Sequence, residues 1–191
     1  KARQKGLNII DATCPLVKNV HNIVSRLQAE RYQIIVWGDR HHPEVEGILG
    51  WCAGQAIVIA DLEETKKIKV KGRLGIVSQT TKDVQGFSAL VSYFLPQAGE
   101  IRVFNTICPA STKRQGAALT LSRQVELMLV IGDKKSSNTR TLFEKCKQTG
   151  VRTYLIQDAA QVKPEWFQGI EEVGITAGAS TPDWIIKEVL E

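Results

Sequence analysis

The sequence has little methionine, few aromatic residues and no long apolar run. Met128 is the only methionine among 191 residues and residue 1 is lysine, so we expect a processed chain or a piece of a longer protein. No apolar run approaches the roughly 18 residues that a membrane-spanning helix needs, and no signal peptide opens the sequence. Aromatic residues make up 6% and charged residues 24%, which is typical of an ordinary globular protein.

Cysteine and net charge exclude two further classes of protein. The four cysteines, at positions 14, 52, 108 and 146, form no C-x-x-C pair, so a zinc finger is not expected. Without export signals they are expected to be reduced thiols. The net charge of +5 is mild and dispersed; it favours an anionic small ligand or an acidic partner and does not indicate nucleic-acid binding.

What is present is an alternation of short apolar runs with amphipathic helical patterns. Val20, Ile23, Val24 and Leu27 lie at helical spacing between two such runs. Continuous apolar runs of this length are typical of parallel strands buried on both faces. We therefore predict an α/β fold with small parallel sheets flanked by helices. The predicted strands are 7–10, 32–37, 56–60, 74–77, 101–104, 127–131, 153–156 and 173–176.

The two halves of the sequence repeat each other. Cys14-Pro15 and Cys108-Pro109 are 94 residues apart, and so are Gly38-Asp39 and Gly132-Asp133. Further on, "GIVSQTTKD" resembles "GITAGASTPD" with the separation grown to 99. Matches in register predict a duplicated α/β unit of about 95 residues. We place the boundary at 98/99, giving repeats 1–98 and 99–191 that pack closely because no low-complexity linker separates them.

Cys14 and Cys108 each follow an apolar run and precede a proline that opens a helical pattern. A free cysteine is often only a small buried hydrophobe. A thiolate at a strand-to-helix turn is, however, stabilised by the helix N-terminus and is a good ligand for soft metals. Cys52 and Cys146 lack this placement, and we interpret both as structural.

Other polar residues follow the predicted strands at the edge where parallel α/β sheets bind ligands. Ser136, Ser137 and Asn138 suit a helix N-cap, and the same position suits a phosphate; the residues alone leave both open. Ser180 lies in the matching loop of the next strand. The remaining candidates are His42 and Glu44, a plausible acid/base pair around Pro43, and the residues Gln79, Thr80 and Thr81.

The motifs "DATCPLV", "HPEVEG", "SQTT", "TIC", "SSN" and "TAGAS" occur in this order from about residue 11 to residue 182. Together they resemble the 4-hydroxy-3-methylbut-2-enyl diphosphate reductases, iron–sulfur enzymes of the methylerythritol phosphate route to isoprenoids. The resemblance implies three similar α/β domains around a 4Fe–4S cluster held by one cysteine from each domain. It also implies reductive removal of the substrate's hydroxyl as water, giving isopentenyl and dimethylallyl diphosphate.

The resemblance assigns roles to residues of this sequence. Cys14 and Cys108 would be cluster ligands, Glu44 the proton source, and Thr80 the residue that positions the hydroxyl and the proton relay. The diphosphate would be held by His42, Ser136, Ser137, Asn138 and Ser180.

The sequence departs from the family pattern because the repeat occurs twice rather than three times. The third cysteine ligand is therefore expected from an N-terminal domain outside these residues, and this chain alone is expected to be inactive. Two other interpretations stay open: a non-catalytic diphosphate-binding module, and a zinc or disulfide site at Cys14 and Cys108. The expected partners are a small diphosphate substrate and an electron donor such as ferredoxin or flavodoxin, in the cytoplasm or a plastid, with neither nucleic acid nor membrane.

Overall fold

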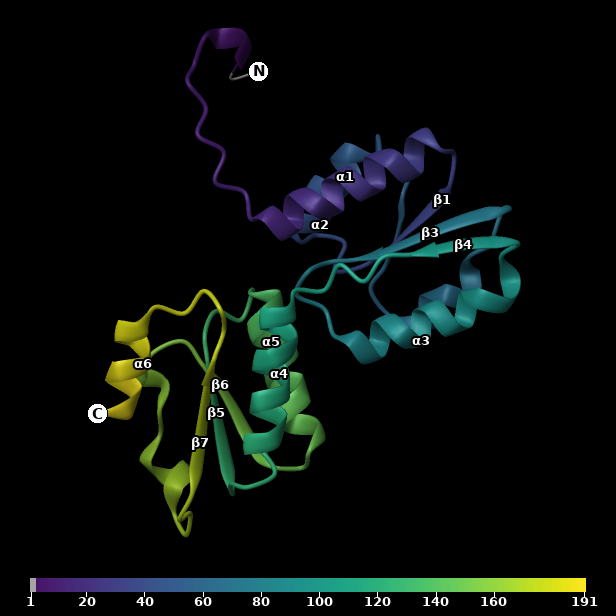
Figure 1. The fold of residues 1–191 in the computed structure, drawn as a ribbon. Coiled ribbons are helices and arrows are strands. Elements are labelled where there is room, and N and C mark those ends of the chain that lie inside the picture. Colours follow the sequence, from purple (N-terminus) through teal and green to yellow (C-terminus); the bar gives the residue numbers. More distant parts are fainter. Residues whose placement is uncertain (1–2) are drawn as a thin grey trace.

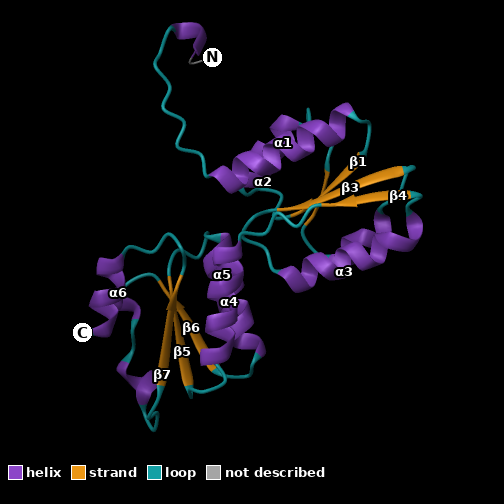
Figure 2. Ribbon diagram, in the orientation of Figure 1, coloured by secondary structure: helices purple, strands orange, loops and turns teal. Residues whose placement is uncertain are grey.

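The computed structural model describes residues 3–191 and shows two α/β units, each built on a small parallel sheet flanked by helices (Figures 1 and 2). The predicted fold class is confirmed. The first sheet has the order β2-β1-β3-β4, and the second has the order β6-β5-β7. The strands are β1 (Gln33–Trp37), β2 (Ile57–Ile59), β3 (Arg73–Ser78), β4 (Glu100–Val103), β5 (Leu127–Ile131), β6 (Arg152–Ile156) and β7 (Val173–Ala177). All their pairings are parallel.

Helices cover both faces of each sheet (Figure 1). The α-helices are α1 (Pro15–Ala29), α2 (Pro43–Trp51), α3 (Val84–Phe94), α4 (Pro109–Leu121), α5 (Ser137–Gln148) and α6 (Asp183–Leu190). Short 3-10 turns add Arg3–Lys5, Leu62–Lys67, Leu95–Gln97, Ala159–Gln161 and Pro164–Phe167. None of the helices in residues 3–191 combines the length and the apolar composition needed to cross a membrane.

The alternation of side chains along a strand divides each core into two layers. Ile34 and Val36 of β1 pack with α1 and α2, whereas Ile35 and Trp37 pack with α3 on the other face. In the second unit, one face of β5 packs against α4 and α5 and the other against α6. Cys52 and Cys146 are fully buried members of these cores, which confirms their structural interpretation.

The predicted duplication is visible in the geometry. Strand β5 begins and ends 94 residues after β1, and α5 begins 94 residues after α2. A Cβ on Gly38 would lie 2.8 Å from the Val45 side chain, and a Cβ on Gly132 would lie 2.7 Å from that of Thr139, its counterpart in the repeat. In both units glycine therefore lets the strand end approach the following helix closely.

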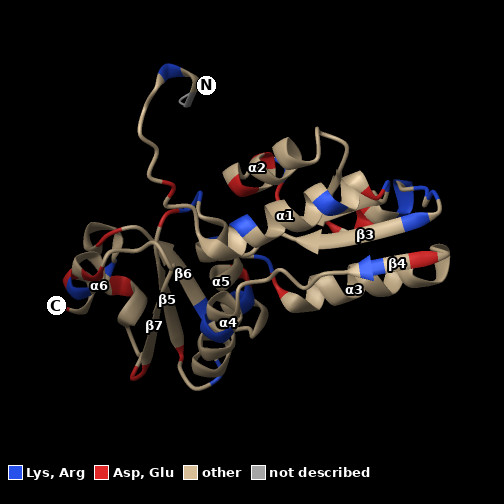
Figure 3. Ribbon diagram, turned by 45° about the horizontal axis from the view of Figure 1, so that its top comes forward, with Lys and Arg blue, Asp and Glu red and all other residues tan. Residues whose placement is uncertain are grey.

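Strand β4 belongs to the first sheet, although residues 99–191 were expected to form the second repeat. It pairs with β3, and the chain passes to the second sheet only after β4. Charged residues of β4 (Figure 3) hold it there: Glu100 accepts a hydrogen bond of 2.7 Å from Arg73, and Arg102 pairs with Glu30 at 2.6 Å. Both guanidinium groups lie over the ring of Tyr32, at 4.2 and 4.8 Å. The boundary at 98/99 describes where the second copy of the sequence repeat begins, and it stays a prediction.

The strand predicted at residues 7–10 was wrong. The segment between Leu7 and Cys14 has no regular secondary structure, and 90% of Ile10 is exposed. In the repeat this segment corresponds to β4. That strand lies at the edge of its sheet and precedes Cys108 in the chain. An edge strand is stable only with a neighbouring strand to pair with, and no strand of residues 3–191 pairs with this segment.

Candidate functional site

The polar residues predicted from the sequence gather where the strands of both sheets end. Each loop leads from the carboxyl end of a parallel strand into the next helix, so backbone N–H groups point toward this edge. His42 and Ser136 are the N-cap residues of α2 and α5, and both cap their helix with a side-chain atom. The duplicated fold thus repeats the same capped helix start in both units.

Glu44, Thr80 and Cys108 form a continuous contact. The Glu44 carboxylate accepts two hydrogen bonds from Thr80, one from its backbone N–H at 2.7 Å and one from its hydroxyl at 2.8 Å. The carbonyl of Thr80 in turn accepts the N–H of Cys108 at 2.8 Å. Thr80 is 6% exposed, and these three bonds hold it between the carboxylate and the start of α4. The structure therefore places the predicted acid beside the predicted relay and one predicted metal ligand.

His42 has one ring nitrogen committed and one available. Its Nδ1 accepts the backbone N–H of Glu44 at 3.2 Å, which caps α2. In a neutral imidazole the proton then lies on Nε2, because Nδ1 is the acceptor. His42 can therefore donate from Nε2 to an anion in the cavity that it lines.

A cavity of about 610 Å³ brings His42 together with Ser136 and Ser180, three of the residues predicted to hold a diphosphate. Its wall also includes Arg40, His41, Pro43, Asp39, Asp133, Lys135 and Arg140. The cavity thus has three cationic side chains, two carboxylates, two hydroxyls and two imidazoles in its wall. Arg140 pairs with Asp39 and Arg40 with Glu64, and the excess of positive charge favours an anion. These cations were not identified from the sequence, because Arg40 and Lys135 lie in loops without a distinctive motif and Arg140 lies one helical turn beyond the serines.

Asn138 is nearly buried at 4% exposure, yet neither atom of its side-chain amide has a hydrogen-bond partner among residues 3–191. A buried polar group without a partner costs about 1–3 kcal/mol. In this position, in the first turn of α5, a ligand that carries acceptors and donors would satisfy the amide. This supports the sequence interpretation of Asn138 as a substrate-binding residue.

The side chains of Ser137, Gln79 and Thr81 are bonded to other groups of the protein, and their predicted substrate contacts stay predictions. Gln79 is fully buried; its Oε1 accepts the N–H of Asp39 at 2.9 Å, and its Nε2 donates to Thr81 at 2.8 Å. Ser137 lies 3.1 Å from the hydroxyl of Thr81 and 3.3 Å from the carboxylate of Asp39. These bonds link residues within the first unit and join Thr81 to Ser137 of the second.

The two remaining candidates are thiols. Cys14 is exposed and Cys108 half-buried, both are free, and both are N-cap residues that make no side-chain capping bond. Thiols at helix N-termini match the donor chemistry of an iron–sulfur cluster. Within residues 3–191 no three His, Cys, Asp or Glu side chains gather to hold a metal. Burial raises the pKa of the Cys52 and Cys146 thiols, which makes them poor substitutes.

The sequence is similar to a known protein family and to enzymes of one name. The family model described as LytB protein matches residues 1–191. The 4-hydroxy-3-methylbut-2-enyl diphosphate reductase of Pelobacter propionicus is 46% identical over 190 residues, which are 100% of this chain and 68% of that protein. The enzyme of the same name from Helicobacter pylori is 44% identical over 187 residues, 98% of this chain and 68% of its own length.

Solved structures agree with the fold. A structure described as (E)-4-hydroxy-3-methyl-but-2-enyl diphosphate reductase, the terminal enzyme of the non-mevalonate pathway, is 44% identical with a TM-score of 0.62, over 99% of this chain and 68% of that one. The E-1-hydroxy-2-methyl-but-2-enyl-4-diphosphate reductase from Plasmodium falciparum is 28% identical with a TM-score of 0.90, over 99% of this chain and 61% of that one. With the family match extending over every residue, this chain belongs to the LytB protein family.

Proposed function

We propose that this chain is part of an oxidoreductase that converts 4-hydroxy-3-methylbut-2-enyl diphosphate to isopentenyl and dimethylallyl diphosphate, the last step of the methylerythritol phosphate pathway. The relatives carry this activity in their names. The observation that carries the proposal is the pair of hydrogen bonds from Thr80 to the Glu44 carboxylate, with Cys108 bonded to Thr80 in turn. A fixed carboxylic acid next to a metal-ligating thiol is the arrangement that a reductive dehydroxylation needs.

The diphosphate binds in the cavity between the two helix starts. His42 donates from Nε2, Ser136 and Ser180 donate from their hydroxyls, and Arg140 and Lys135 supply positive charge. The N-terminus of α5 adds backbone N–H groups and the amide of Asn138. These contacts fix the charged end of the substrate, so that its hydroxyl-bearing end points toward Glu44 and Thr80.

The leaving hydroxyl needs a proton, and Glu44 supplies it. A protonated Glu44 passes its proton to Thr80 Oγ1 while Thr80 passes its own proton to the substrate oxygen. The carbon–oxygen bond then breaks and water leaves, and the allyl group takes up two electrons from the electron donor and a second proton from solvent. The hydrogen bond of 2.8 Å between the side chains of Glu44 and Thr80 is the path of the first proton. The backbone N–H of Thr80 on the other carboxylate oxygen keeps the acid from rotating away.

The cofactor of this proposal is a 4Fe–4S cluster. Cys14 and Cys108 are the ligands that this chain offers, and the relatives' remaining third of sequence is the expected source of the third thiolate. When bound, such a cluster would pass the two electrons of the reaction from the electron donor to the substrate. The electron donor is an acidic ferredoxin or flavodoxin, which would suit the net charge of +5.

Activity of the full-length protein, reconstituted anaerobically, tests the assignment. Glu44→Gln keeps the shape of the acid but removes its proton, and we expect kcat to fall by about 10²–10⁴-fold. Glu46→Gln is the matched control, because Glu46 is an exposed glutamate on the same helix. Equal activities of the two variants would contradict the proposal. Pyrophosphate binding that is unaffected by Cys14→Ser and Cys108→Ser, in a protein without reductase activity, would instead support the non-catalytic module.

A further inference from the structure

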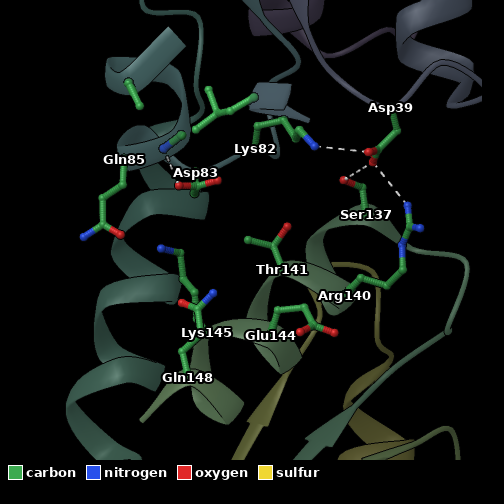
Figure 4. Close-up of a pocket in the computed structure, with 13 residues that line it drawn as sticks. Asp39, Lys82, Asp83, Gln85, Ser137, Arg140, Thr141, Glu144, Lys145 and Gln148 are labelled. Carbon is green, nitrogen blue, oxygen red and sulfur yellow. Dashed lines mark hydrogen bonds and ion pairs between the residues drawn. The ribbon is translucent and has the colours of Figure 1, made fainter. Parts of the chain in front are cut away.

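Asp39 joins the two units. It follows β1, and its carboxylate faces Lys82 of its own unit together with Ser137 and Arg140 of the other (Figure 4). Oδ1 accepts from Lys82 Nζ at 3.1 Å, and Oδ2 accepts from Ser137 Oγ at 3.3 Å and Arg140 Nη2 at 3.2 Å. Three donors, one from the loop before α3 and two from α5, thus converge on one half-buried carboxylate.

The same residues close a ring of hydrogen bonds with a consistent direction. The N–H of Asp39 donates to Gln79 Oε1, and Gln79 Nε2 donates to the hydroxyl of Thr81. Thr81 donates to Ser137 Oγ at 3.1 Å, and Ser137 donates back to Asp39. In this arrangement the hydroxyl proton of Ser137 is directed to Asp39.

Charge strengthens the ring. Burial raises the pKa of Asp39, but the opposing effects of Lys82, Arg140 and the Ser137 hydrogen bond outweigh it and hold the pKa below its usual value. Lys82 is itself fixed, with 14% of its side chain exposed and its ammonium 4.8 Å from the centre of the Trp37 ring. A carboxylate held between two cations, one of them largely buried, gives the contact a definite geometry.

The repeat provides an internal comparison. Asp133 is the counterpart of Asp39, 94 residues later. Its Oδ1 accepts the N–H of Lys135 at 2.7 Å within its own loop. The loop can therefore fold without a carboxylate that contacts the other unit. Of these two aspartates, Asp39 is the one that makes the contact between units.

Asp39 lines the cavity proposed for the diphosphate, although it is not one of the residues predicted to bind the diphosphate. With Arg140 it lines both that cavity and a second hollow of about 620 Å³ between α3 and α5 (Figure 4). Ser137, its partner, stands between Ser136 and Asn138, two of the proposed diphosphate ligands. Whatever fixes Ser137 therefore fixes the first turn of α5 relative to His42.

Given the function proposed above, we propose that Asp39 is a positioning residue: it fixes the start of α5 against the end of the first sheet, so that the diphosphate ligands of both units face one cavity. Loss of the carboxylate leaves the chemistry at Glu44 and Thr80 intact. The effect is therefore expected in substrate binding rather than in turnover.

The test uses the full-length, reconstituted protein with Asp39→Ala, Asp39→Glu and Arg140→Ala, and with Glu63→Ala as a control that removes an exposed ion pair to Lys66. We expect Asp39→Ala to raise KM for the substrate and Kd for inorganic pyrophosphate about 10-fold, with kcat at saturation within about threefold of the parent. Asp39→Glu, which keeps the charge, should restore most of the affinity. Asp39→Ala combined with Arg140→Ala should weaken binding less than the product of the two single effects.

Hydrogen exchange in the first turn of α5 gives a readout independent of activity, and it should be faster in Asp39→Ala than in Glu63→Ala. Unchanged KM, Kd and exchange, or a loss of kcat at unchanged KM, would overturn the role given to Asp39. If the unmodified protein reduces no substrate, the proposed function fails. The pyrophosphate and exchange measurements then still decide on Asp39.

Discussion

Thr80→Val tests the proton path most sharply, because it removes one oxygen atom and nearly preserves shape. Thr80 donates to both oxygens of Glu44, and valine keeps the backbone N–H bond at 2.7 Å while deleting the hydroxyl bond at 2.8 Å. A hydrogen bond from a neutral donor to a carboxylate contributes about 1.5–3 kcal/mol. Thr80 is almost buried, so water does not readily replace the hydroxyl.

The loss of kcat should correspond at least to the free energy of that hydrogen bond. It should reach about 10²-fold, which is the contribution of a positioned proton donor. Thr80→Ser, which restores the hydroxyl, should recover most of the rate. Glu44→Gln and Thr80→Val act on the same proton, so the double variant should be little slower than Glu44→Gln alone. The assay is kcat at saturating substrate under anaerobic conditions. A Thr80→Val enzyme within twofold of the parent, or strictly additive losses, would refute the relay.

Three further outcomes follow from single sites. Cys108→Ser should lower the iron and sulfide bound per reconstituted protein, whereas Cys146→Ser, in the buried core, should leave both unchanged; equal contents would contradict ligation. The hydrogen bond from Arg73 is the main cause that lowers the pKa of Glu100 from 4.5 to about 2, so its stabilising effect is present above pH 4.5 and is lost as the pH falls toward 2. Urea unfolding of Glu100→Gln should accordingly show a smaller loss of stability on acidification than the parent, and an equal loss would contradict this. Gly178→Ala places a Cβ 2.2 Å from the Thr139 hydroxyl and should destabilise by about 1–3 kcal/mol in thermal unfolding; failure of Thr139→Ala to relieve that cost would contradict the proposed clash.

Repetition and strand-to-helix turns made most of the fold predictable. The shift of 94 residues between Gly38-Asp39 and Gly132-Asp133 also relates β1 to β5 and α2 to α5 in the structure. The error at residues 7–10 has a physical origin, because an apolar run has strand character only when a sheet edge accepts its hydrogen bonds. Strand β4 illustrates the same point, since its sequence lies in the second repeat while its hydrogen bonds lie in the first sheet.

At the site, the joint roles of Glu44 and Thr80 came from the family resemblance, since residue types alone paired Glu44 with His42. Glu44 and Thr80 were expected together and are in contact. Asp39 was noted only as part of a repeated Gly-Asp pair, because nothing local distinguishes it from Asp133. Its contacts to Ser137 and Arg140 depend on how two units pack, and residues about 100 positions apart in the sequence reveal this only after folding.

Product analysis tests the central claim most directly. The full-length protein containing this chain, reconstituted with iron and sulfide and supplied with reductant, is incubated with 4-hydroxy-3-methylbut-2-enyl diphosphate, and the products are identified by mass. The proposed reaction predicts isopentenyl and dimethylallyl diphosphate in amounts that account for the substrate consumed. Recovery of unchanged substrate from a protein that carries its full complement of iron and sulfide would contradict it.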